Sequence, residues 1–284
     1  MELPDSLKDY LTREAWGGVA RLEPLSGGCI NNALRLETQR GPVCLLKINA
    51  RAPRDLFVRE AEGLEALRVA GGPRLPRVYA CDPHWILLEF VASGSRKPHF
   101  AERLGEQLAR LHATTAPRFG FEHDNYLGAT PQPNPWSEDG YSFFAEQRLG
   151  YQARLALGRG LLSVEEVQCV ERIASRLPLL IPEQPASLLH GDLWGGNVIV
   201  GPEGEPVLID PAAHYGWAEA ELAMTSLFGG FDPTVYSAYE ATRTVAPDYR
   251  QRFPLYNLYH LLNHLNLFGS AYHAQVAAVL RHYL

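Results

Sequence analysis

The stretch that decides the fold is Leu189-His190-Gly191-Asp192-Leu193-Trp194-Gly195-Gly196-Asn197. Short apolar runs flank it at residues 188–189 and 198–200, which predicts a polar loop between two short strands. Asp192 precedes Asn197 by five positions, and Asp210 follows thirteen residues later at the end of another apolar run. His-Gly-Asp and Gly-Gly-Asn are also good turn sequences, so ordinary turns are the alternative interpretation of the loop alone. The acidic residue at the end of the next strand favours a catalytic site.

The spacing from Asp192 to Asn197 is that of the catalytic loop His-Arg-Asp-Leu-x-x-x-Asn of kinases. Phosphoryl transfer requires a carboxylate beside the attacking hydroxyl group, and we predict that Asp192 is this base. It also requires oxygen ligands for Mg²⁺, because this hard cation binds carboxylate and amide oxygens together with substrate phosphates. We predict that Asn197 and Asp210 are these ligands and that ATP is the phosphoryl donor.

A lysine in the N-terminal third fits the same chemistry. Lys47 interrupts the apolar run at residues 43–48, where a charge is costly unless it is used. Glu60 lies on the amphipathic helix predicted over residues 55–69. We predict that Lys47 pairs with Glu60 and contacts the phosphates of ATP. The alternative is an exposed strand lysine and a solvated helical glutamate.

Two further segments are candidates for nucleotide contacts. Gly27 and Gly28 lie between two predicted strands, where backbone N–H groups could hold phosphates. The full Gly-x-Gly-x-x-Gly spacing is missing, so an ordinary hairpin turn explains these glycines as well. Backbone groups of Glu89 and Val91, where two lobes are expected to join, are candidates for adenine contacts.

The apolar pattern predicts an α+β protein, and together with the kinase-like catalytic loop it predicts the bilobal protein-kinase-like fold. A small antiparallel sheet with one main helix is expected first, followed by a larger, mostly helical lobe. Ser93-Gly94-Ser95 is the first stretch with the composition of a linker. We therefore place an ATP-binding lobe at residues 1–92 and a catalytic and substrate-binding lobe at residues 93–284. Strands are predicted at residues 19–25, 33–37, 43–48, 77–81 and 85–91, and later helices at residues 101–114, 141–157, 164–177 and within 218–284.

Composition narrows the class of protein. The 284 residues carry a formal net charge of −6, which argues against nucleic-acid binding because that function normally leaves a basic surface. No apolar run approaches the roughly 20 residues of a membrane span, and residues 1–9 do not resemble a signal peptide. The four cysteines lack zinc-site spacing, which predicts reduced thiols and a cytoplasmic location. A small molecule is the expected partner, with no nucleic acid and no membrane, and the monomer and the homodimer both stay open.

Several segments along almost the whole chain resemble the fructosamine kinase family, whose relatives include the aminoglycoside and choline kinases. The loop variant Leu193-Trp194 and the segment Thr130-Pro131-Gln132-x-Asn134 separate this family from other kinases. The other similar segments are Gly27-Gly28-Cys29-Ile30-Asn31, Phe57-x-x-Glu60-Ala61-x-Gly63-Leu64, Asp124-Asn125-Tyr126-Leu127-Gly128, Phe144-x-x-Gln147-Arg148-Leu149, Ile209-Asp210-Pro211 and Leu222-Ala223-Met224-Thr225-x-Leu227-Phe228-Gly229-Gly230-Phe231.

The resemblance implies ATP-dependent phosphorylation of a ketosamine at the sugar O3 hydroxyl, after which the unstable adduct releases its amine. Sugar recognition needs directional polar groups and an aromatic platform, and one short segment supplies both. The predicted substrate residues are Asn125, Thr130, Gln132, Asn134 and Trp136, together with Trp194 of the loop. A surface loop held by its own turns is the alternative for that segment. The resemblance also implies that Cys29 could be a redox switch, although a cysteine that stays reduced is an equal alternative.

The sequence departs from the family pattern after Asp210. Trp217 replaces an acidic residue, and Glu221 replaces the aspartate that in kinase-like folds buttresses the catalytic loop. Glutamate keeps the charge but is one methylene longer, so its hydrogen bonds to the loop could be displaced. Two alternatives to a ketosamine kinase stay open. One is a kinase for another small molecule such as an aminoglycoside or choline, and the other is a catalytically inactive nucleotide-binding protein, which the departures at Trp217 and Glu221 favour. His112 is interpreted as a helix-terminal residue, and the histidines at 260, 264, 273 and 282 as a helical scatter without a metal site.

Overall fold

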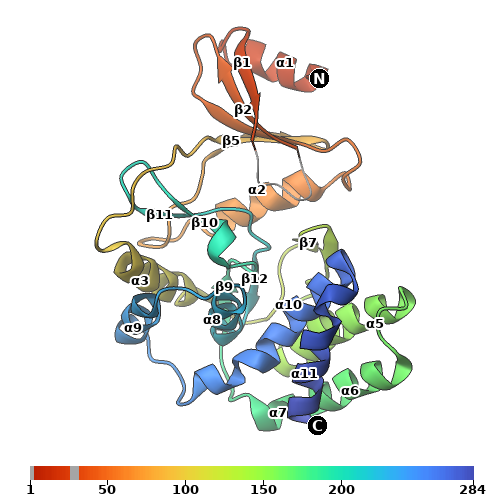
Figure 1. The fold of residues 1–284 in the computed structure, drawn as a ribbon. Helices are drawn as coiled ribbons and strands as arrows, with labels where there is room; N and C mark the ends of the chain where they lie inside the picture. Colours follow the sequence, from red (N-terminus) through yellow and green to blue (C-terminus); the bar gives the residue numbers. More distant parts are fainter. Residues whose placement is uncertain (1–2, 26–31) are drawn as a thin grey trace.

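The structure is a computed structural model that describes residues 3–25 and 32–284. Figure 1 shows a small sheet-containing lobe above a larger helical lobe, which confirms the predicted α+β bilobal fold. The strands are β1 (Val19–Pro24), β2 (Asn32–Thr38), β3 (Cys44–Ile48), β4 (Val78–Asp82), β5 (Trp85–Glu89), β6 (Thr115–Ala116), β7 (Asn125–Leu127), β8 (Thr130–Gln132), β9 (Ala186–Leu189), β10 (Val198–Val200), β11 (Pro206–Leu208) and β12 (His214–Gly216). The α-helices are α1 (Asp5–Arg13), α2 (Leu56–Ala66), α3 (Phe100–His112), α4 (Gly140–Phe143), α5 (Tyr151–Gly158), α6 (Val164–Ser175), α7 (Leu177–Leu180), α8 (Ala218–Leu227), α9 (Pro233–Thr242), α10 (Phe253–Phe268) and α11 (His273–Tyr283). A π-helix, η1 (Phe144–Gly150), and the 3₁₀ turns η2 (Gly195–Asn197), η3 (Tyr249–Arg252) and η4 (Ser270–Tyr272) complete the described elements.

The N-terminal sheet is antiparallel, with the strand order β1-β2-β3-β5-β4. Successive side chains of a strand point to opposite faces. On β3, Cys44, Leu46 and Ile48 therefore join a small core on one face. Lys47 points to the other face, where α2 and the larger lobe lie. The alternation along β3 thus places Lys47, the charged residue of this strand, at the interface between the lobes.

Helix α1 was not predicted from the sequence. It is nine residues long, and helices of this length are marginal in water unless they pack against other elements. Leu7, Tyr10 and Leu11 form its buried face and belong to the small core beneath the sheet. The first lobe therefore contains two helices among the described residues, one on each face of the sheet, rather than one.

Helix α2 belongs to the core of the larger lobe as much as to the sheet. Leu56, Phe57 and Leu64 are buried in the main hydrophobic cluster, which continues through the helices of the second lobe. At Gly63 an added Cβ would lie 3.4 Å from the side chains of both Pro211 and Ala213. A methyl group at this position would therefore be in ordinary van der Waals contact with the segment that follows Asp210.

The second lobe is built around α10, which packs against α5, α8 and α11. The predicted helix over residues 141–157 is present, but its middle is the π-helix η1, and π segments are often found at functional sites. Helices α3 and α9 pack very closely, because an added Cβ at Gly105 would lie 2.2 Å from the Val235 carbonyl oxygen. The predicted helical region over 218–284 is divided into α8 to α11 by short turns.

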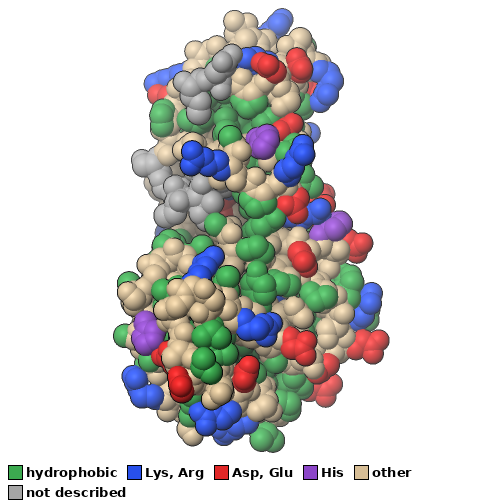
Figure 2. Space-filling model, turned by 90° about the vertical axis from the view of Figure 1, so that its right-hand side faces the viewer, with side chains coloured by type: hydrophobic (Ala, Val, Ile, Leu, Met, Phe, Trp, Pro, Cys, Tyr) green, Lys and Arg blue, Asp and Glu red, His purple; other side chains and the backbone are tan. Residues whose placement is uncertain are grey.

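The chain passes from β5 to α3 through residues 90–99, and the predicted boundary at residue 92 falls in this connection. A second link joins the lobes through Arg74, whose carbonyl oxygen accepts a hydrogen bond of 2.9 Å from the N–H of Leu208. Its guanidinium pairs with Glu89 at 2.5 Å and with Glu205 at 2.8 Å. Figure 2 shows hydrophobic side chains continuing through the narrow region where the upper and lower parts meet. Among the helices of the described residues, none has the combined length and apolarity of a membrane span.

Candidate active site

The predicted catalytic loop connects β9 to β10 and ends in the turn η2. Gly191 adopts a φ of 85°, and a Cβ there would lie 2.1 Å from the Ala212 carbonyl oxygen. This close approach explains why glycine occupies the position between His190 and Asp192. The loop is thereby packed against the chain that follows Asp210.

Asp192 and Asn197 form one hydrogen-bonded unit. The Asn197 amide Nδ2 donates to the Asp192 carbonyl oxygen at 2.8 Å and to its carboxylate Oδ2 at 3.2 Å. Burial, together with the negative charge of Asp210, raises the pKa of the Asp192 carboxyl to about 7. A carboxyl group with a pKa near neutrality is suited to accept a proton during catalysis.

His190 holds the loop from inside. It is fully buried, and its Nε2 donates to the Ile209 carbonyl oxygen at 2.8 Å. Its Nδ1 is then the acceptor for the Asp192 N–H at 3.3 Å. Burial lowers the pKa of His190, which favours this neutral form. His190 therefore positions Asp192 and ties the loop to the residue before Asp210.

Lys47, Glu60 and Asp210 meet at the interface between the lobes. The Lys47 Nζ lies 2.6 Å from Glu60 Oε1 and 2.5 Å from Asp210 Oδ1. Burial alone would lower the pKa of Lys47, but the two carboxylates outweigh it and hold that pKa above its ordinary value. The predicted pairing of Lys47 with Glu60 is present, and it includes Asp210 as well.

The predicted metal ligands have oxygen atoms to offer. Because the Asn197 Nδ2 is used within the loop, its Oδ1 is the atom of that amide left for a cation. The Asp210 side chain is 48% exposed, and its Oδ1 binds Lys47, so Oδ2 is the oxygen that a cation could use. An amide oxygen and a carboxylate oxygen are the donors that Mg²⁺ prefers, so these residues fit the ion.

Glu221 supports the catalytic loop from below. Its Oε1 accepts a hydrogen bond of 2.7 Å from the Gly191 N–H, and its Oε2 accepts one of 3.1 Å from the His190 N–H. Oε2 also lies 2.8 Å from Nε2 of the buried His112, whose Nδ1 bonds the Tyr239 hydroxyl. Burial alone would raise the pKa of Glu221, but these partners hold it below its ordinary value.

The hydrogen bonds of Glu221 bear on two expectations from the sequence, one about Glu221 and one about His112. The longer side chain of Glu221 still reaches the loop, so its bonds are not lost. His112 is not merely a helix-terminal residue, because it is buried at the centre of this support. Its position one helical turn after Leu108, on the buried face of α3, was the available signal in the sequence.

The other departure, Trp217, is an aromatic core residue. Its side chain is buried, and its ring centroid lies 5.4 Å from those of both Tyr141 and Phe144. Phe119 and Tyr256 add edge contacts at 6.0 and 6.1 Å. An acidic side chain at this place would lose this packing and would put a charge among aromatic rings, which is costly unless the charge is paired.

The polar residues predicted to bind the sugar form a buried network. Asn125, Gln132 and Asn134 are each at most 5% exposed. Gln132 Nε2 donates to Asn125 Oδ1 at 2.7 Å, and Asn134 Nδ2 donates to the same oxygen at 3.1 Å. Thr130 is buried beside them, and its hydroxyl has no partner among the described residues. Their contact with a sugar stays a prediction, and the structure shows them holding the β7–β8 hairpin.

Trp194 lies differently, at the edge of an aromatic surface near Asp192. It is 38% exposed, and its ring meets the edge of Phe228 at 6.0 Å. Phe228 in turn lies 4.6 Å from the ring of His264, which α10 contributes. The sequence interpretation of His264 as part of a helical scatter missed this cluster. Trp136, by contrast, is half-buried against Tyr215 at 6.1 Å.

The predicted adenine contacts lie where β5 leaves the sheet. The Glu89 N–H donates to the Arg77 carbonyl oxygen at 2.7 Å, so only its carbonyl group remains for adenine. Val91 follows in the connection between the lobes. These contacts stay predictions. Gly27, Gly28 and Cys29 lie outside the described residues.

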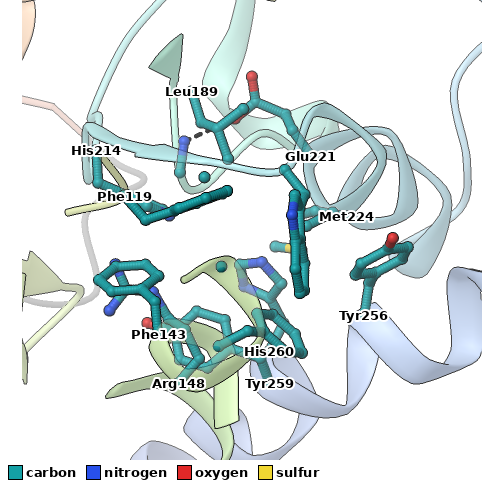
Figure 3. Close-up of a pocket in the computed structure, with 16 residues that line it drawn as sticks. Phe119, Phe143, Arg148, Leu189, His214, Glu221, Met224, Tyr256, Tyr259 and His260 are labelled. Atoms are coloured by element: carbon teal, nitrogen blue, oxygen red, sulfur yellow. Dashed lines mark hydrogen bonds between the residues drawn. The ribbon is translucent and has the colours of Figure 1, made fainter. Parts of the chain in front are cut away.

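A small cavity lies among aromatic and polar side chains next to Leu189 and Glu221 (Figure 3). Its volume of about 30 Å³ suffices for a water molecule or two and is too small for a sugar. Gly191 and Glu221 line it on the side of the loop, and His214 and His260 line it elsewhere. Burial lowers the pKa of His260 to about 3, so this side chain is neutral. The cavity therefore belongs to the support of the loop and not to the acceptor site.

Comparisons with known proteins agree with this geometry. The sequence model described as "Fructosamine kinase" matches residues 10–284. A probable ketoamine kinase of Synechocystis is 41% identical over 263 residues, covering 90% of this chain and 88% of that protein. The chloroplastic protein-ribulosamine 3-kinase of Arabidopsis thaliana is 35% identical, covering 99% of this chain and 88% of that protein.

Solved structures show the same relationship. A structure from Thermobifida fusca, assigned as a fructosamine-3-kinase, superposes with a TM-score of 0.89 at 35% identity and covers 98% of both chains. An aminoglycoside phosphotransferase solved with AMP-PNP and hygromycin B superposes with a TM-score of 0.61 at 17% identity, covering 98% of each chain, which is a likeness of fold. The chain belongs to the fructosamine kinase family and is a small-molecule kinase with the bilobal fold of the protein-kinase-like phosphotransferases.

Proposed function

We propose that this protein uses ATP to phosphorylate the O3 hydroxyl of a ketosamine, after which the phosphorylated adduct breaks down and frees the amine. The observation that carries the proposal is the convergence of Lys47, Glu60 and Asp210 beside the Asp192–Asn197 unit. A cation for the phosphates, oxygen ligands for a metal and a base for the hydroxyl are the parts that phosphoryl transfer needs.

Each side chain has a separate task in this proposal. Asp192 accepts the proton of the attacking hydroxyl, and its pKa of about 7 suits this role near neutral pH. Lys47, held by Glu60, contacts the phosphates of ATP. Asn197 and Asp210 hold Mg²⁺, which when bound neutralises charge on the transferred phosphoryl group. Glu221 and His190 keep the loop in place, because both bond its backbone or its neighbours.

The choice of acceptor rests on the aromatic surface and on the relatives. Trp194, two residues after the proposed base, is partly exposed and packs with Phe228 and His264, and an exposed aromatic face suits the apolar side of a sugar ring. Relatives of 41% and 35% identity are named as a ketoamine kinase and a protein-ribulosamine 3-kinase. The same acceptor class is therefore proposed for this chain.

An ATP-consumption assay with a small panel of acceptors tests the proposal. The panel contains ribulosamine and fructosamine adducts of lysine, choline and an aminoglycoside. Turnover of a ketosamine, with loss of about a thousandfold or more in Asp192→Asn, is expected, since general base catalysis contributes roughly 10²–10⁴-fold. Turnover of only choline or the aminoglycoside would exclude the ketosamine, and ATP binding without any turnover would exclude the catalytic role.

A further inference from the structure

We infer that the β7–β8 hairpin is a brace that holds α2 in its catalytic position, and that Tyr126 is the positioning residue that joins the two. This inference rests on the proposed function, because it assigns a part of the same site. It also gives the family segment Asp124-Asn125-Tyr126-Leu127-Gly128 a role other than substrate contact.

The hairpin contacts α2 directly. The Tyr126 hydroxyl donates a hydrogen bond of 2.6 Å to the carboxylate of Asp55, the residue at which α2 begins. Further along the helix, His123 Nδ1 lies 3.3 Å from Glu62 Oε2. The hydrogen bond from Tyr126 lowers the pKa of Asp55, so this acceptor is a carboxylate at neutral pH. The two contacts flank Glu60, the partner of Lys47.

The same hairpin also holds the chain that follows Asp210. Asn125 Nδ2 donates to the Ala213 carbonyl oxygen at 2.8 Å. Gln132 Nε2 donates to the Ala212 carbonyl oxygen at 3.1 Å. These carbonyl groups lie two and three residues after Asp210, in the segment that packs against Gly63 of α2.

The base of the brace is fixed in the larger lobe. The buried Arg148 donates from Nη2 to Asn134 Oδ1 at 2.6 Å and from Nη1 to the Pro133 carbonyl oxygen at 2.6 Å. The Tyr259 hydroxyl of α10 donates to Gln132 Oε1 at 2.7 Å. The hairpin therefore cannot shift relative to η1 and α10 without breaking buried hydrogen bonds, which are costly to leave unmade.

One rigid element thus contacts both structures that bring a carboxylate to Lys47. Glu60 comes from α2, and Asp210 comes from the segment next to Ala212 and Ala213. By holding both, the brace keeps the Lys47 pair assembled in the absence of nucleotide. The Tyr126 hydroxyl bonds the carboxylate of Asp55 and can be removed without changing the size of the ring, which makes it the place to test.

The test compares Tyr126→Phe with Tyr249→Phe. The control hydroxyl donates a similar bond of 2.7 Å to the carboxylate of Glu240, within the larger lobe and outside the proposed machinery. Amide hydrogen exchange across residues 56–66 is expected to speed up about tenfold in Tyr126→Phe, because a hydrogen bond to a charged group is lost. The control is expected to leave this exchange unchanged.

Kinetics provide a second readout. For Tyr126→Phe, kcat/KM for ATP is expected to fall roughly tenfold, with KM for the acceptor unchanged and with a thermal shift similar to that of Tyr249→Phe. Asp55→Ala should reproduce the defect, and adding it to Tyr126→Phe should have little further effect.

The outcomes separate the inference from the proposed function. Unchanged exchange in α2 of Tyr126→Phe would overturn the brace, and so would an equal effect of both phenylalanine variants on ATP kinetics. If α2 exchange rises only in Tyr126→Phe while the wild type phosphorylates no ketosamine, the brace stands and the acceptor assignment falls.

Discussion

At the residue scale, the raised pKa of Asp192 suits a catalytic base but lowers the stability of the folded protein at neutral and higher pH. The pKa of its carboxyl is raised to about 7 by burial and by Asp210, whereas an unfolded aspartate ionises near its ordinary value of 3.8. The folded protein therefore binds the proton more tightly than the unfolded chain does. Stability from this residue is fully present below about pH 4 and is lost as the pH rises through 7.

The loss of stability with rising pH leads to the first prediction. Asp192→Asn, which carries no ionisable group, is expected to unfold at a higher temperature than the wild type at pH 8. At pH 5 the folded carboxyl is mostly protonated while the unfolded one is still mostly ionised, so the difference should be clearly smaller than at pH 8 and should vanish only as the pH falls below about 4. Thermal unfolding followed by circular dichroism at the two pH values measures this, and a wild type as stable as the variant at pH 8 would contradict the raised pKa.

Glu221 differs from Asp192, because hydrogen bonds to its buried carboxylate hold its pKa below the ordinary value. The second prediction is that Glu221→Gln lowers the free energy of unfolding by about 2–3 kcal/mol, because bonds to a buried charged group are broken. Glu240→Gln is the matched control, because that carboxylate likewise accepts several hydrogen bonds, from Tyr249 and Arg250, but lies nearer the surface. Urea unfolding should show a loss of less than about 1 kcal/mol in the control, and equal losses would refute the special role of Glu221.

At the element scale, Gly63 in α2 and Gly105 in α3 differ in how closely the neighbouring element approaches the helix. Gly63 on α2 has room for a methyl group, because its nearest neighbours would lie at an ordinary distance of 3.4 Å. Gly105 on α3 has none, because the backbone of α9 would lie 2.2 Å away. Helix α2 therefore meets its neighbours through side chains, whereas α3 is in contact with the backbone of α9.

The third prediction compares alanine at these two sites. Gly63→Ala is expected to leave stability unchanged or to raise it by up to about 1 kcal/mol, because alanine favours the helix. Gly105→Ala is expected to lower stability by roughly 1–3 kcal/mol, because α3 and α9 must move apart. Chemical denaturation of both variants checks this, and a more stable Gly105→Ala would show that the helices can separate without loss.

At the scale of the whole molecule, the lobes share one hydrophobic core and meet at charged residues. Lys47 of the sheet binds Asp210 of the larger lobe directly, and Arg74 links β5 to the turn after β10. A nucleotide bound between the lobes would contact both, so it should stabilise the molecule as a unit.

The fourth prediction concerns this stabilisation. ATP with Mg²⁺ at about a hundred times its Kd is expected to add about 2.7 kcal/mol to the free energy of unfolding. Removing Mg²⁺ with EDTA should abolish most of the effect in the wild type. In Asp210→Asn the response to Mg²⁺ should be weak, because a proposed carboxylate ligand is lost. A thermal shift independent of Mg²⁺ would contradict the assignment of Asn197 and Asp210.

Local sequence alone determined much of this protein. The spacing from Asp192 to Asn197, the placement of Asp210 after a strand, and Lys47 on an alternating strand predicted the reaction type and the bilobal fold. These signals are local because a loop motif and a strand period are properties of neighbouring residues. The short helix α1 was not predicted, because a helix of this length is stabilised only by its packing against the sheet.

Only the tertiary structure decided what the remaining residues do. Asn125, Gln132 and Asn134 have the polar groups of a sugar site, but the fold buries them and pairs them with each other and with the chain after Asp210. His112 and Glu221 are 109 positions apart, and nothing in the local pattern of either predicts their bond. A polar side chain's role depends on which distant groups surround it, and that is settled when the lobes and the hairpin pack together.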